Sequence, residues 1–113
     1  MLLAFEDERA LAQALADVLA MPLAFIAQHR FPDGELKLTL PPSLPDRVVL
    51  LRGLHQPNDK LIALLLAAQT ARRLGAGELT LVSPYLAYMR QDIEFQPGEA
   101  ISQRIVAGFL AGL

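Results

Sequence analysis

Cysteine is absent from the 113-residue sequence, and charged residues make up only 19% of it. Without cysteine the chain can form neither a disulfide nor a thiolate metal site. The formal net charge is −2, with 10 basic and 12 acidic side chains spread along the chain. A general nucleic-acid-binding protein needs a concentrated basic face, so we expect no nucleic-acid partner.

Long apolar runs are missing as well. The longest one, residues 18–27, contains Pro22 and falls short of the roughly 20 residues that a membrane-spanning helix needs. Glu6, Asp7 and Glu8 come before any apolar segment that could serve as a signal peptide. We therefore expect no membrane association and a soluble cytoplasmic domain.

Apolar residues, in contrast, make up 53% of the chain, a large share for one small domain. Small domains bury a smaller fraction of their surface than large ones, so part of this apolar surface should need covering. Residues 109–113 add a last stretch without a charged side chain. We expect the chain to pack against copies of itself and to continue into a second domain.

The spacing of apolar residues predicts both strands and helices. Residues 36–40 alternate between leucine and polar residues, a pattern typical of a half-buried strand, whereas residues 48–51 are continuously apolar, as in a strand buried on both faces. Leu11, Leu15, Val18 and Leu19 keep helical spacing. Asn58 is expected to cap a second helix, which ends near Gly75.

The predicted order is strand 2–5, helix 7–20, strand 23–27, strand 35–40, strand 48–51, helix 58–74, strand 78–83 and helix 101–110. This alternation predicts an α/β fold with a mainly parallel sheet, flanked by helices and carrying an antiparallel hairpin at its edge. Ligands of such sheets bind beyond the carboxyl ends of the strands. The loops after Leu51 and Ser83 are therefore the first candidates for a site.

Arg90, Gln91 and Asp92 follow the strand that ends near Ser83. An arginine can fork onto a phosphate, an amide can donate and accept, and a carboxylate can orient a donor or a metal-bound water, so the trio suits a nucleoside triphosphate. The alternative is a solvated loop with a local Arg90–Asp92 pair. We interpret Tyr85 and Tyr88 as packing residues.

Phe31, Asp33 and Glu35 belong to a Pro-Asp-Gly turn. An exposed ring beside two carboxylates could stack on a base and accept from its amino group. The alternative, which the residues alone favour, is an ordinary turn with Phe31 in the core. Neither the Walker phosphate loop nor the Rossmann glycine pattern occurs, which argues against a self-sufficient kinase or dehydrogenase.

Four segments together resemble the amino-terminal domain of ribose-phosphate pyrophosphokinase, over essentially the whole chain. They read Phe-Pro-Asp-Gly-Glu, Pro-Asn-Asp, Pro-Tyr-Leu-Ala-Tyr-Met-Arg-Gln-Asp and Gly-Glu-Ala-Ile-Ser, at residues 31–35, 57–59, 84–92 and 98–102. The resemblance implies a phosphoribosyltransferase-like fold, with residues 1–113 forming the ATP-side domain of a two-domain enzyme whose carboxy-terminal domain is absent here. That family transfers diphosphate from Mg-ATP to ribose 5-phosphate, giving phosphoribosyl pyrophosphate and AMP.

The same resemblance implies a homo-oligomer with the ATP site at a subunit interface. Phe31, Asp33 and Glu35 would hold the adenine of a neighbouring subunit, while Arg90, Gln91 and Asp92 would contact ATP in their own. Mg²⁺ would accompany ATP, and no metal ligand or catalytic residue lies within this chain. The family's ATP-contacting His, catalytic Lys and ribose 5-phosphate loop come after residue 113, so we expect the isolated chain to be inactive.

Two departures from the family pattern keep other interpretations open. Ile93 and Glu94 stand where the family commonly has basic residues, and the family's regulatory Ser and Arg have no match in residues 41–47. One alternative is therefore a non-catalytic regulatory or oligomerising paralogue. Another is an unrelated α/β interaction domain.

Overall fold

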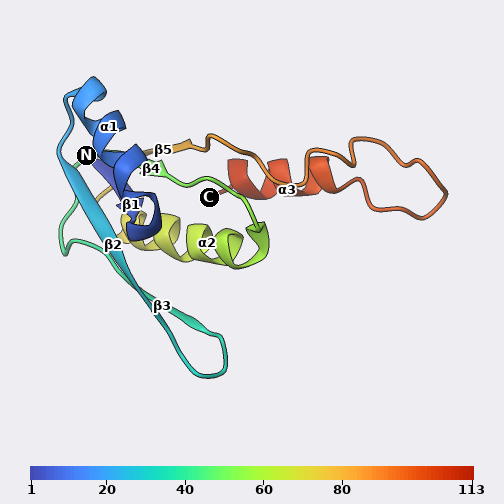
Figure 1. Cartoon of the computed structure of the whole chain (residues 1–113), viewed down its shortest axis with the longest axis horizontal. Helices are drawn as coiled ribbons and strands as arrows, with labels where there is room; N and C mark the ends of the chain where they lie inside the picture. Colours follow the sequence, from blue (N-terminus) through green and yellow to red (C-terminus); the bar gives the residue numbers. More distant parts are fainter.

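The computed structural model describes all residues 1–113 and contains five strands and three α-helices (Figure 1). In chain order the elements are β1 (Leu2–Phe5), the 3₁₀ turn η1 (Glu6–Glu8), α1 (Arg9–Leu19), β2 (Leu23–Arg30), β3 (Leu36–Thr39), β4 (Arg47–Leu51), α2 (Pro57–Arg73), β5 (Glu78–Val82) and α3 (Ser102–Ala111).

The strands form one sheet in the order β3-β2-β1-β4-β5. β1 pairs in parallel with β2 and β4, and β4 pairs in parallel with β5. Only β3 is antiparallel, with Ala27 opposite Thr39 across the hairpin. The prediction of a mainly parallel sheet with an antiparallel edge hairpin is thus confirmed.

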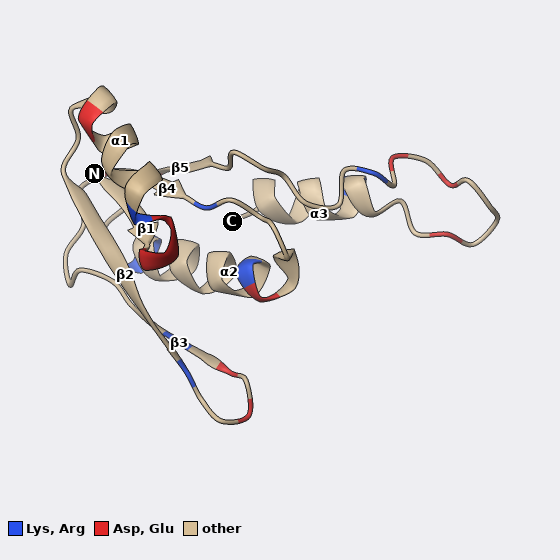
Figure 2. Ribbon diagram, viewed as in Figure 1, with Lys and Arg blue, Asp and Glu red and all other residues tan.

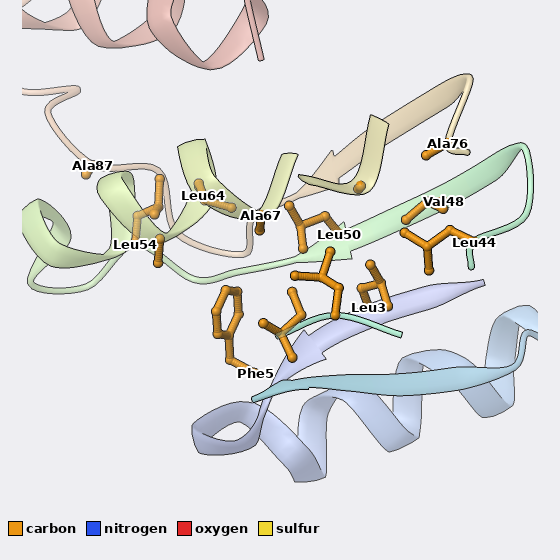
Figure 3. Packing of buried hydrophobic residues seen from close by; sticks show 14 residues of the cluster. Leu3, Phe5, Leu44, Val48, Leu50, Leu54, Leu64, Ala67, Ala76 and Ala87 are labelled. Atoms are coloured by element: carbon orange, nitrogen blue, oxygen red, sulfur yellow. The ribbon is translucent and has the colours of Figure 1, made fainter. Parts of the chain in front are cut away.

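The two faces of the sheet are covered by different helices. On one face, β1 and β4 side chains such as Leu3 and Leu50 pack with Leu64 and Ala67 of α2 (Figure 3). On the other face, Ala12 and Ala16 of α1 pack against Leu2, Ala4 and Leu51. The sheet is therefore the middle layer of an α/β domain.

The fully buried stripe of α1 consists of alanines. Leu11, Val18 and Leu19 remain 46%, 83% and 43% exposed, while the buried residues of the helix are Ala12 and Ala16. Small alanine side chains let the helix approach the sheet closely. Two apolar stripes lie side by side on this helix, and their spacing alone does not reveal which one faces the sheet.

The start of α2 differs from the expectation. Pro57 occupies the first helical position, where its fixed φ and missing N–H are tolerated. Gln56 precedes it in a left-handed conformation, with no side chain capping the helix. Asn58 lies within the first turn, so the prediction that it is the capping residue is wrong.

Candidate functional site

An open pocket of about 800 Å³ lies beyond the carboxyl ends of β4 and β5. Residues 54–58 and 85–91 form most of its wall, and Ser102 at the start of α3 completes it. The Leu54 N–H donates to the Tyr85 carbonyl at 2.9 Å and so ties the two loops together. These are the loops that the strand order singled out as candidates.

Arg90 and Gln91 line this pocket, whereas Asp92 does not. Arg90 is exposed and makes no ion pair or side-chain hydrogen bond, so the alternative of a local Arg90–Asp92 pair is wrong. Gln91 is anchored, because its Nε2 donates to the Ile93 carbonyl at 2.9 Å and its own carbonyl accepts from the Gln103 N–H at 3.1 Å. The guanidinium of Arg90 is free to bind an anion.

Tyr88 shapes the backbone just before Arg90. Its φ is +62°, in the left-handed region that costs free energy for a residue with a bulky side chain. The Tyr88 hydroxyl donates to Asn58 Oδ1, which links this loop to the first turn of α2. Sequence reasoning missed this role, because no local pattern marks a tyrosine with positive φ.

Aromatic side chains line the same pocket as Arg90. The Tyr85 ring stacks on His55 with centroids 4.2 Å apart and an interplanar angle of 20°. Tyr85 and Tyr88 are 44% and 39% exposed, so each ring is only partly packed. The pocket thus combines flat apolar surface with one unpaired cation.

Phe31 lies at the β2–β3 hairpin and is 40% exposed. Its ring meets His29 edge-on, with centroids 4.9 Å apart. Asp33 Oδ1 accepts from the Glu35 N–H at 3.0 Å, and Gly34 has a φ of +94°, so the turn needs glycine there. The Glu35 carboxylate has no partner. The alternative that placed Phe31 in the core is wrong.

Arg30 connects the hairpin to α2. Its Nη1 donates to the Gly34 carbonyl at 2.9 Å, and its Nη2 pairs with Asp59 Oδ2 at 2.8 Å. The hairpin projects from the sheet away from the loop between β5 and α3 (Figure 1), and no hairpin residue lines the pocket. Within one chain, Phe31, Asp33 and Glu35 therefore do not meet Arg90, Gln91 and Asp92.

The loop that joins β5 to α3 projects from the body, and beyond Arg90 its few charged residues are acidic (Figure 2). Glu94 accepts from the Gly98 N–H, and Glu99 Oε1 accepts from the Gln96 N–H at 2.6 Å, so both carboxylates stabilise the loop itself. No three His, Asp or Glu side chains gather closely enough to hold a metal ion. None of the helices combines the length and apolarity that crossing a membrane requires.

Comparison with known proteins places this geometry in a family. The sequence model of the N-terminal domain of ribose phosphate pyrophosphokinase matches residues 1–113. The chain is 45% identical over 101 residues to a ribose-phosphate pyrophosphokinase of Saccharolobus solfataricus, covering 88% of this chain and 35% of the relative. It is 41% identical over 98 residues to the enzyme of Methanopyrus kandleri, covering 86% of this chain and 34% of the relative.

A structural comparison points to the same family. The crystal structure of phosphoribosylpyrophosphate synthetase from Mycobacterium smegmatis superposes with a TM-score of 0.88 at 26% identity, covering 99% of this chain and 38% of that one. The chain thus spans about a third of the length of the curated relatives it matches. Residues 1–113 belong to the family of N-terminal domains of ribose phosphate pyrophosphokinases.

Proposed function

We propose that this chain is the ATP-side domain of a two-domain ribose-phosphate pyrophosphokinase of cytoplasmic nucleotide biosynthesis. The complete protein would transfer the β,γ-diphosphoryl group of ATP to the 1-hydroxyl of ribose 5-phosphate, giving phosphoribosyl pyrophosphate and AMP. The observation that carries the proposal is the unpaired Arg90 beside Gln91 in the open pocket, in a chain of this family. The ribose 5-phosphate site would belong to the second domain.

The part of this domain in the reaction is to bind and align the nucleotide. Arg90 would offer its planar fork to phosphate oxygens, an interaction stronger than a neutral hydrogen bond. Gln91 would add its side-chain amide, which is held in place because its Nε2 donates to the Ile93 carbonyl. Phosphoryl transfer depends mostly on positioning and on neutralising charge, so such contacts contribute directly to the rate.

The hairpin supports a site shared between two copies. Phe31 presents an exposed ring and Glu35 an unpaired carboxylate, and both are remote from the pocket of their own chain. A second copy could therefore receive this hairpin against its nucleotide, with the ring on the adenine and Asp33 and Glu35 near its amino group. This arrangement makes the active form a homo-oligomer.

Mg²⁺ would arrive with ATP rather than occupy a site built by this domain. Asp92 is one exposed carboxylate outside the pocket lining, and no cluster of metal-binding side chains accompanies it. Mg²⁺ is commonly bound through substrate phosphates and water, which fits this sparse donor set. Bound there, the metal supplies positive charge to the phosphates. With no catalytic residue of its own, the isolated chain should be inactive.

Substitution of Arg90 by glutamine in the full-length protein tests the proposal. Loss of a charge-assisted contact of about 1.5–3 kcal/mol should weaken ATP binding about tenfold or more, measured by calorimetric titration. Arg73→Gln is the matched control, because Arg73 is exposed at the far end of α2 and outside the pocket. Equal ATP affinities of the Arg90 variant and the control would contradict the proposal.

A second candidate function rests on Ile93 and Glu94. Ile93 is 53% exposed directly after the segment that would hold phosphates, and Glu94 adds negative charge there. Both weaken the positive field expected around ATP. A non-catalytic paralogue that assembles with an active enzyme would tolerate this change, and it would form no phosphoribosyl pyrophosphate.

A further inference from the structure

The two loops that follow β4 and β5 run side by side and are joined at successive points. The Arg52 N–H donates to the Val82 carbonyl at 3.0 Å, and the Leu54 N–H donates to the Tyr85 carbonyl at 2.9 Å. Next along both loops, the His55 ring stacks on the Tyr85 ring. The contacts between the loops therefore continue from the strand ends toward the pocket.

The last of these contacts joins Tyr88 to Asn58. The Tyr88 hydroxyl donates to Asn58 Oδ1, although the two residues are 30 positions apart in the sequence. α2 is anchored in the core through residues such as Ala63 and Leu64, so its first turn offers the neighbouring loop a fixed point. The Asn58 side chain thus holds the loop after β5 and does not cap its own helix.

Tyr88 needs a fixed point because its backbone is strained. Its φ of +62° lies in the left-handed region, which is unfavourable for an L-residue with a large side chain. Between β5 and α3 the one other residue with a positive φ is Gly98, which tolerates it. A return of Tyr88 to negative φ would turn the chain two residues before Arg90. The hydroxyl contact opposes that return, as surrounding structure must wherever such strain persists.

Arg90 lies between two residues that are held in place. Tyr88 comes before it, and Gln91 after it is bonded to the Ile93 carbonyl and to the Gln103 N–H. The Arg90 side chain itself makes neither an ion pair nor a hydrogen bond. Its direction into the pocket therefore depends on the backbone on either side of it.

We propose that Tyr88 and Asn58 are positioning residues that orient Arg90 toward the phosphates of the bound nucleotide. The inference rests on the proposed function, in which Arg90 binds ATP. Neither Tyr88 nor Asn58 has to touch ATP, because their contact keeps the loop in the conformation that brings Arg90 to the pocket wall. Without the contact, only a fraction of the molecules would hold that conformation, and the apparent ATP affinity would fall in proportion.

ATP titration of the full-length protein in a double-mutant cycle tests this inference. Tyr88→Phe keeps the ring and removes only the hydroxyl, so it should weaken ATP binding about fivefold, the effect of one lost hydrogen bond. Asn58→Ala should have the same effect, and the two changes together should be no worse than either alone. Thr80→Val is the control, because it removes an exposed hydroxyl from β5 outside the pocket, and it should bind ATP like the wild type.

Combination with Arg90→Gln separates positioning from direct contact with the nucleotide. In that background Tyr88→Phe should leave the ATP affinity unchanged, because the side chain that it positions is gone. A fivefold loss in both backgrounds would overturn the inference, since Tyr88 would then act on ATP by itself. A loss with Arg90→Gln but none with Tyr88→Phe would also overturn it. No loss with Arg90→Gln would contradict the proposed ATP site and the positioning role together.

Hydrogen exchange without ATP reports on the contact independently of the proposed function. Tyr88→Phe and Asn58→Ala should each accelerate amide exchange in residues 88–92 about fivefold, because the loop opens more often. Exchange in β1 and the free energy of unfolding should stay at their wild-type values, since both side chains are exposed. Unchanged exchange in residues 88–92 would overturn the inference, because the loop would then keep its conformation without the contact.

Discussion

Phe31 is the single residue for which exposure decides between two roles. Its ring is 40% exposed, lies beside a turn built by Asp33 and Gly34, and meets the His29 ring edge-on. A core phenylalanine would be buried among aliphatic side chains. The geometry favours a ring that is presented to a partner.

Phe31→Ala should therefore affect binding more than folding. If the ring stacks on adenine, ATP affinity of the full-length protein should fall by roughly 1–3 kcal/mol. Phe31→Leu keeps most of the volume but loses the aromatic face, so it should weaken ATP binding almost as much. Calorimetric titration measures both variants.

Chemical denaturation of the same two variants shows whether the Phe31 ring is instead part of the core. A core ring would cost about 3–5 kcal/mol of unfolding free energy on truncation to alanine, and leucine would restore much of it. That pattern, with unchanged ATP affinity, would return Phe31 to a purely structural role.

At the scale of elements, predictions succeeded where the signal was local. The alternation of Leu36, Leu38 and Leu40 with polar residues places the leucines inward and Lys37 and Thr39 outward, as the structure has them. This works because side chains of a strand alternate between its two faces regardless of the rest of the fold.

The sequence does not predict features for which tertiary contacts decide between two local options. On α1 the leucine-rich stripe and the alanine stripe both have helical spacing, and only the close approach to the sheet selects Ala12 and Ala16. At the candidate site, the sequence around Tyr88 does not predict its positive φ or its hydrogen bond to Asn58. The hairpin lies far from the pocket because of the strand order of the whole sheet, which local patterns do not predict.

Substitutions on the two stripes of α1 test which one packs. Ala12→Leu adds volume to a fully buried position and should lower the free energy of unfolding by about 1–3 kcal/mol. Val18→Ala removes a side chain that is 83% exposed and should change it by less than about 0.5 kcal/mol. Denaturant titration checks both, and the reverse ranking would mean that α1 packs through its leucine stripe.

At the scale of the molecule, the high apolar content of the sequence leaves a large apolar surface on the domain. Only 22 of 113 residues are buried although 53% are apolar, so much apolar surface is left uncovered. It includes Val18 on α1, Ile62 on α2, and Ile93 and Phe95 on the projecting loop. No residue of α3 is buried. Exposed apolar area on this scale is typical of surfaces that pack against other protein, consistent with the proposed second domain and second copy.

The most direct test of the central claim is to measure AMP release by the full-length protein supplied with ATP, Mg²⁺ and ribose 5-phosphate. We predict AMP and phosphoribosyl pyrophosphate in equal amounts, none without ribose 5-phosphate, and none from residues 1–113 alone. ATP binding without AMP release by the full-length protein would contradict the enzyme assignment and favour the non-catalytic paralogue.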